Sequence, residues 1–178
     1  MKVNEAIIEK DFWVVLVLDY LFNKSEFKKA FTFKGGTSLS KGYSLIRRFS
    51  EDIDLILNWT VFGIPQNEPY EDRSNTQQNR YNQAINDKAA TFIKKTLLYE
   101  IKTGLSNLLG FNVDMECDKT EGNIILFRYP RLYTNNSILS TIRLEFGPLA
   151  AWTPSEVIRV SPYINDYYPD VMNQPFAK

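Results

Sequence analysis

The chain has 178 residues, 44% of them apolar and 14% aromatic, and its 21 acidic residues balance its 21 basic residues. This length supports one well-cored domain and is too short for two ordinary ones. The balanced charge excludes a protein that is held to nucleic acid mainly by a bulk excess of basic residues. Histidine is absent and Cys117 is the single cysteine, which excludes histidine-dependent catalysis, internal disulfides and multi-thiolate or histidine zinc sites. Catalysis must therefore use carboxylates, lysine, arginine, hydroxyl groups or a metal.

The sequence carries no signal for a membrane or for secretion. Its longest strongly apolar run, residues 12–18, is flanked by Asp11 and Asp19 and is much shorter than the roughly 20 residues of a membrane span. The first residues are acidic and lack the basic start and cleavage site of a signal peptide. A lone cysteine fits a reducing compartment. We therefore expect a cytoplasmic protein without a membrane partner.

The first part of the chain predicts alternating helices and strands. Asn4 is a suitable N-cap for a packing helix that runs to about Phe22. Residues 30–34 alternate in polarity and end at a pair of glycines, which indicates a short strand entering a tight turn. A helix of two to three turns is expected over 38–47, and a second strand from about Asp52 to Asn58.

A long loop and a long helix are expected next. Residues 60–79 show no apolar period and contain two prolines, which is typical of a loop. Residues 80–109 fit an amphipathic helix that ends at Gly110. Its apolar positions are Ile85, Ala89, Phe92, Thr96, Ile101, Leu105 and Leu108. A solvated face explains its lysines better than contact with nucleic acid does, and these are Lys88, Lys94, Lys95 and Lys102.

The last part of the chain predicts strands. Three are expected, at about 111–117, 123–129 and 138–146, and a short strand signal follows at 156–160. In the third strand, alternation places Ile138, Ile142, Leu144 and Phe146 on one face and Arg143 and Glu145 on the other. The remaining residues are rich in proline and aromatic side chains.

Asp52 and Asp54 form the first chemical motif. Alternate residues of a strand share a face, so both carboxylates point the same way while Ile53 and Leu55 point into the core. Two such carboxylates repel each other by about 4 kcal/mol at an effective dielectric near 20, and a divalent cation between them would reverse this repulsion. Glu145 is a candidate third carboxylate. The pattern indicates a site for Mg²⁺.

A Gly-Gly-Thr-Ser turn at residues 35–38 forms the second motif. It lies between a predicted strand and a predicted helix, where backbone N–H groups can hold a phosphate. It is neither a Walker P-loop nor a dinucleotide-binding fingerprint. Taken singly, a glycine pair is usually an ordinary turn and an Asp-x-Asp strand usually carries two solvated residues. Their succession as strand, turn, helix and carboxylate strand is much more specific and indicates a nucleotide-using enzyme.

This order of elements resembles the DNA polymerase beta-like nucleotidyltransferase superfamily, and the local sequences are similar to its AbiEii/AbiGii toxin family. The similar segments are residues 8–14, 33–41, 48–55 and 142–147, which together touch most of the chain. The resemblance implies an α+β nucleotidyltransferase fold. We expect a mixed, twisted sheet with helices packed on one side and the carboxylates lining a cleft on the other.

The resemblance also implies a reaction: transfer of a nucleoside monophosphate from an NTP to an acceptor, with pyrophosphate leaving and two Mg²⁺ ions holding the phosphates. Asp52, Asp54 and Glu145 would be the metal ligands and catalytic residues, with Glu145 near the acceptor hydroxyl. The NTP would be bound by the glycine turn and two cations, which are Gly35, Gly36, Thr37, Ser38, Lys41 and Arg48. For the two cations, an ordinary surface position is the competing explanation.

Members of this family are linked to abortive phage infection and to toxin–antitoxin pairs. The resemblance therefore implies a phage-defence toxin, with RNA, particularly tRNA 3′ ends, as the acceptor and a cognate antitoxin as a partner. Family members continue past the strand domain into a helical segment, so residues 1–178 are expected to form a single nucleotidyltransferase domain without it. The alternative is a catalytically inactive nucleotide-binding or protein-interaction module. An aspartyl phosphatase is disfavoured, because its Asp motif does not follow a Gly-Gly-Thr-Ser turn.

Overall fold

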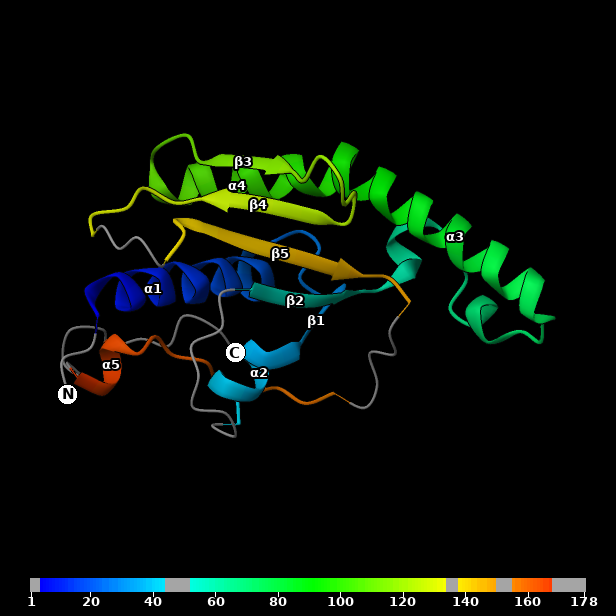
Figure 1. Cartoon of the computed structure of the whole chain (residues 1–178), viewed down its shortest axis with the longest axis horizontal. Helices are drawn as coiled ribbons and strands as arrows, with labels where there is room; N and C mark the ends of the chain where they lie inside the picture. Colours follow the sequence, from blue (N-terminus) through cyan, green and yellow to red (C-terminus); the bar gives the residue numbers. More distant parts are fainter. Residues whose placement is uncertain (1–3, 44–51, 134–137, 150–154, 168–178) are drawn as a thin grey trace.

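A mixed five-stranded sheet forms the centre of the molecule (Figure 1). The structure is a computed structural model that describes residues 4–43, 52–133, 138–149 and 155–167. Within these ranges the strand order is β1-β2-β5-β4-β3, with β2 and β5 parallel and the other neighbours antiparallel. The strands are β1 (Phe31–Lys34), β2 (Asp52–Leu57), β3 (Asp114–Cys117), β4 (Ile124–Arg128) and β5 (Thr141–Gly147). The predicted α+β class with a mixed sheet is confirmed.

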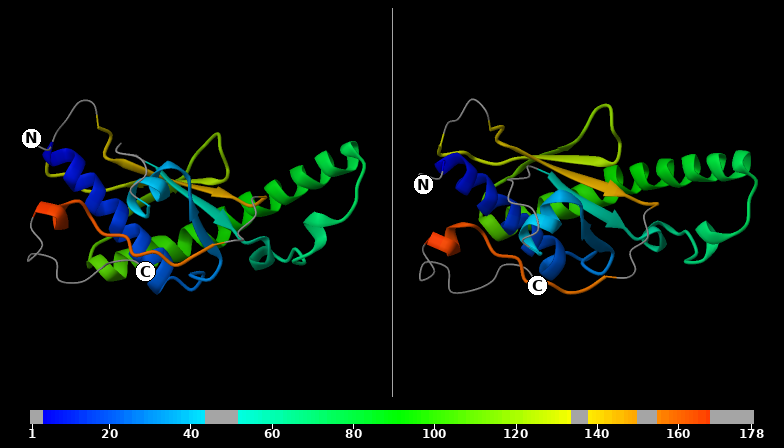
Figure 2. Two further views of the ribbon diagram at one scale, coloured as in Figure 1. Left: turned by 90° about the horizontal axis from the view of Figure 1, so that it is seen from below. Right: turned by 60° about the horizontal axis from the view of Figure 1, so that its bottom comes forward.

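Two helices, α1 (Glu5–Asp19) and α4 (Leu98–Leu109), cover one face of the sheet, and α3 (Asn75–Phe92) projects beyond its end (Figures 1 and 2). The Asn4 side chain accepts a hydrogen bond from the Ala6 backbone N–H, so the predicted N-cap of α1 is confirmed. Shorter helical segments complete the described chain: η1 (Tyr20–Lys24), α2 (Gly35–Lys41), η2 (Trp59–Phe62), η3 (Glu68–Tyr70), η4 (Ile93–Leu97) and α5 (Ile164–Tyr167).

The core lies between the sheet and helices α1 and α4. On β2 and β5 the inward-facing side chains Ile53, Leu55, Ile142, Leu144 and Phe146 are all fully buried. From Trp13 to Asp19 every residue of α1 is buried, which makes α1 the central core helix. Burial of each such large apolar side chain stabilises the fold by about 1.5–3 kcal/mol. The predicted alternation of β2 and β5 is thereby confirmed, and it leaves their polar residues on the opposite face.

The long helical region begins earlier than predicted and contains a π-helical turn. Ser74 caps α3 through a capping box with Gln77, so the helix starts at Asn75 and the predicted loop over 60–79 is wrong at its end. That loop also contains η2 and η3. The predicted C-terminal end at Gly110 is confirmed by its left-handed φ of 75°.

The π-helical turn η4 changes which side chains face the core. The buried residues recur at every fourth position: Ile85, Ala89, Ile93, Leu97, Ile101 and Leu105. An α-helix has 3.6 residues per turn, so a strict four-residue spacing would drift around it, and the wider turn η4 offsets this drift. Thr96 and Leu108, both predicted on the apolar face, are exposed instead.

Other elements also differ from the predictions, among them β3, which begins at Asp114 rather than at about residue 111. Helix α2 begins at Gly35, directly at the glycine turn, rather than at residue 38, and it ends at Lys41 instead of continuing through residues 42–43 as predicted. Residues 44–47 of the predicted helix lie outside the described residues. Strand β5 begins at Thr141, because Ile138 lies in a bend. Over 156–160 the described chain forms only an isolated bridge at Val160 rather than a strand. Among the described segments, no helix combines the length and apolar composition that a membrane span requires.

Candidate active site

The three predicted carboxylates lie on neighbouring strands and share one face of the sheet. Asp54 on β2 stands opposite Glu145 on β5 in the parallel ladder, and Asp52 stands opposite Arg143. All three carboxylate residues are partly buried, while their neighbours along each strand are in the core. The structure therefore brings together two parts of the chain that are far apart in sequence.

The charge of Asp54 is disfavoured by its surroundings. Burial raises the pKa of Asp54 above its ordinary value, and the charges of Glu145 and Asp52 raise it further, whereas the ammonium of Lys34 lowers it. Ionised Asp54 thus interacts with two other carboxylates, those of Glu145 on β5 and of Asp52 on its own strand. A site of this kind favours the binding of a cation.

The chemistry of these three side chains suits a hard divalent cation, because Mg²⁺ prefers carboxylate oxygen ligands. Their mutual repulsion would be relieved by a cation. In the described parts of the chain, no three aspartate, glutamate or cysteine side chains form a group that is ready to hold a metal ion as they stand. Coordination by Asp52, Asp54 and Glu145 therefore stays a prediction that their position and chemistry support.

The glycine turn packs directly against the carboxylate strand. Gly35 has a φ of 76°, and a Cβ atom there would lie 1.9 Å from Oδ2 of Asp54, so only glycine fits. The buried Thr37 donates its hydroxyl hydrogen to the backbone carbonyl of Asp52 at 2.6 Å. Ser38 donates to the carbonyl of Gly35 at 2.8 Å. These contacts attach the turn to β2 at both aspartates, while phosphate binding by Gly35, Gly36, Thr37 and Ser38 stays a prediction.

A family model described as "Nucleotidyl transferase AbiEii toxin, Type IV TA system" matches residues 17–176. The chain belongs to the AbiEii toxin family. The matched range contains the glycine turn and both carboxylate strands, whereas the resemblance at residues 8–14 lies outside it. None of the curated proteins and none of the solved structures compared with the chain matches it.

Lys34 is a site residue of this AbiEii-family chain that the sequence analysis missed. It is the last residue of β1 and stands opposite Asp54 in the antiparallel β1–β2 ladder. Its Nζ would lie 3.3 Å from a Cβ on Gly147, so its ammonium extends across β2 towards β5. Its charge lowers the pKa of Asp54. Alternation in residues 30–34 predicts the strand face on which Lys34 lies, but the pairing of β1 with β2 is needed to place Lys34 beside Asp54.

The two predicted cations after the turn have different outcomes. Lys41 forms an ion pair with Asp11 of α1, and its side chain is 4% exposed, so an ordinary surface position is excluded for it. Its predicted contact with phosphate is not tested by the structure. Arg48 lies outside the described residues.

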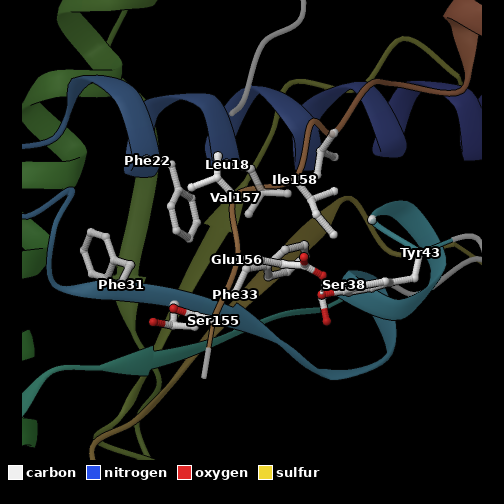
Figure 3. A pocket seen from close by; sticks show the side chains of 13 residues that line it. Leu18, Phe22, Phe31, Phe33, Ser38, Tyr43, Ser155, Glu156, Val157 and Ile158 are labelled. Carbon is white, nitrogen blue, oxygen red and sulfur yellow. Dashed lines mark hydrogen bonds between the residues drawn. The ribbon is translucent and has the colours of Figure 1, made fainter. Parts of the chain in front are cut away.

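A cavity of about 370 Å³ lies beside the turn of this AbiEii-family chain, between α1, α2, β1 and residues 155–160 (Figure 3). Its lining is mainly apolar and includes Leu18, Phe22, Phe33 and Ile158. Ser38 from α2 also lines it, and the Tyr43 hydroxyl donates to the Glu156 carboxylate at 2.7 Å. The three carboxylates of the sheet do not line this cavity, so it is separate from the predicted metal site.

Proposed function

We propose that this protein transfers a nucleoside monophosphate from an NTP to an acceptor hydroxyl and acts as the toxin of a type IV toxin–antitoxin pair. The observation that carries the proposal is the close approach of the glycine turn to Asp54, which itself stands opposite Glu145. The glycine turn and the carboxylate cluster thus lie side by side, which supports a role of the turn in holding phosphate next to a metal site. The family supports the same reaction class and an antitoxin partner.

The residues have distinct proposed tasks. Asp52, Asp54 and Glu145 would hold two Mg²⁺ ions, which when bound stabilise the negative charge on the transferring phosphate. The backbone N–H groups of Gly36 and Thr37, in the first turn of α2, would hold the triphosphate next to these carboxylates. Glu145 would accept the proton of the acceptor hydroxyl, since a carboxylate near that oxygen can act as a general base.

The proposed acceptor is RNA, particularly a tRNA 3′ end, and the proposed setting is defence against phage in the cytoplasm. Balanced net charge means that RNA binding would depend on a local surface rather than on a bulk basic excess. The label-transfer experiment, run with each of the four NTPs, would also identify the base that the enzyme prefers.

The test is transfer of label from each of the four α-labelled NTPs to total RNA with Mg²⁺ present. The wild-type chain should label RNA, and Asp52→Asn, Asp54→Asn and Glu145→Gln should each lower transfer by about a hundredfold or more, the scale of losing a charge-stabilising group. Asp87→Asn is the matched control, because Asp87 is exposed on α3 and its carboxylate accepts a local hydrogen bond from Gln83. Full transfer by Asp54→Asn would refute the proposal. Reversible NTP binding without transfer would instead support an inactive nucleotide-binding module.

A further inference from the structure

A buried ion pair connects α2 to the core helix α1. Lys41, the last residue of α2, pairs with Asp11 of α1, and their side chains are 4% and 0% exposed. Charges that are withdrawn from water this far are tolerated only with good geometry and further hydrogen bonds, and removal of one partner leaves the other charge uncompensated. The pair therefore fixes the C-terminal end of α2 to α1.

Residues from near the C-terminus complete the same cluster. The Tyr163 backbone N–H donates to Oδ2 of Asp11 at 2.6 Å, and Nζ of Lys41 donates to the Ser161 carbonyl at 3.4 Å. Nζ of Lys41 also lies 3.9 Å from the centre of the Tyr163 ring, a favourable cation–π contact. The Tyr163 hydroxyl is 3.2 Å from the hydroxyl of Ser40. Three segments that are distant in sequence thus meet at one buried ion pair.

Helix α2 links this cluster to the glycine turn. At about 1.5 Å per residue, the two turns of α2 form a short rigid rod whose ends are Gly35 and Lys41. One end is held against β2 by the close contact of Gly35 with Asp54 and the hydrogen bond of Thr37 to Asp52. The other end is held by Asp11 and Tyr163. Movement of the Lys41 end would therefore tilt the turn away from the carboxylates.

We propose that Asp11 and Lys41 are positioning residues that, with residues 161–163, hold the glycine turn in place for the nucleotide, and that Lys41 does not bind phosphate. This inference rests on the proposed nucleotidyltransferase function. It assigns a task to Asp11 and to residues 161–163, and it replaces the predicted phosphate contact of Lys41 with an indirect role. The segment that supplies Tyr163 also supplies Glu156 and Ile158 to the cavity beside α2.

The experiment compares Lys41→Met, Asp11→Asn and the double variant in the full chain. The measurements are NTP affinity, hydrogen exchange of residues 35–42, and KM and kcat for label transfer. Each single variant leaves one buried charge without its partner, so we expect NTP affinity to fall and exchange to accelerate by about tenfold or more. The double variant removes both charges of this pair, and both quantities should return to within about threefold of wild type. In the single variants KM should rise more than kcat falls, whereas loss of folded enzyme alone would lower apparent kcat at unchanged KM.

Two results would overturn the inference. One is a double variant that regains slow exchange but keeps the weak NTP affinity of Lys41→Met, because Lys41 would then contact phosphate directly. The other is a pair of single variants that change neither exchange nor affinity. If a single variant does not fold, NTP affinity and hydrogen exchange are compared between the double variant and wild type. Slow exchange with weak NTP affinity in the double variant would then overturn the inference. If the wild-type protein transfers no label, the proposed function is contradicted. Hydrogen exchange needs no nucleotide, so the exchange results would still test whether the ion pair holds the glycine turn in place.

Discussion

Gly35 and Asp54 are in such close contact that no side chain can be added between them. A Cβ atom on Gly35 would lie 1.9 Å from Oδ2, 2.6 Å from Cγ and 2.8 Å from Cβ of Asp54. The φ of 76° at Gly35 independently disfavours any residue with a side chain. Sterics and backbone conformation therefore both require glycine where the turn meets the carboxylate strand.

The Gly35→Ala variant is expected to lose NTP transfer and to be clearly less stable than wild type. The added methyl group must displace the Asp54 carboxylate or the turn, and either movement separates the proposed phosphate and metal ligands. The backbone conformation alone should cost about 1–2 kcal/mol in the free energy of unfolding. Chemical denaturation and label transfer measure the two effects.

Gly63→Ala is the matched control for this variant. Gly63 has a similar φ of 84°, but a Cβ atom there would meet nothing within 4 Å. It should therefore show the conformational penalty of about 1–2 kcal/mol and retain activity. Equal activity in both variants would show that the contact with Asp54 does not matter for transfer.

The local pattern of the site could be predicted from the sequence, but the partners of its residues could not. Strand alternation correctly separated Asp52 and Asp54 from Ile53 and Leu55, because strand geometry fixes the face of each side chain. The partner of Asp54 depends on the parallel pairing of β2 with β5, which is set by packing of the core rather than by nearby residues. For the same reason the pairing of Lys41 with Asp11 on α1 had no local signal.

The long helical region shows a second limit of pattern reading. A helical period with 3.6 residues per turn favoured Phe92 and Thr96 for its buried face, whereas Ile93 and Leu97 are the buried residues. The π-helical turn η4 between α3 and α4 shifts the buried face and brings these two side chains into the core. Ile93 and Leu97 belong to the same buried cluster as side chains of α1 and the sheet, and these packing partners cannot be read from the helical sequence itself.

Asp54→Asn is expected to stabilise the protein when divalent cations are absent. The pKa of Asp54 is raised by burial and by Glu145 and Asp52, so the ionised carboxylate opposes folding at neutral pH. An isosteric amide removes the repulsion, and a cross-strand charge pair suggests a gain of roughly 0.5–1 kcal/mol. Thermal unfolding with a chelator present measures this gain. A less stable Asp54→Asn protein would contradict the repulsive character of the cluster.

The Asp118 carboxylate should contribute a pH-dependent part of the stability. Hydrogen bonds from the hydroxyl and backbone N–H of Thr120 and from the Glu121 N–H lower the pKa of Asp118 from 3.8 to about 2. A lowered folded-state pKa stabilises the protein above the unfolded value, and this contribution is lost as pH falls from about 4 to about 2. Asp118→Asn should therefore be less stable than wild type at neutral pH, and the difference should shrink below about pH 4. A difference that is constant over the acid range would exclude this origin.

Lys34→Met is expected to tighten the binding of Mn²⁺ to the nucleotide-free protein. Lys34 stands opposite Asp54 and lowers its pKa, so its ammonium already offsets part of the negative charge and repels an incoming cation. Two unit charges about 4 Å apart interact by about 1 kcal/mol in bulk water and by about 4 kcal/mol near a protein surface, so removal of the ammonium should tighten Mn²⁺ binding by about fivefold or more. Lys88→Met removes the same charge from an exposed position on α3 and controls for net charge. If both variants bind Mn²⁺ with the wild-type affinity, Lys34 is not a counter-ion of the carboxylates, and its position over Gly147 reflects packing alone.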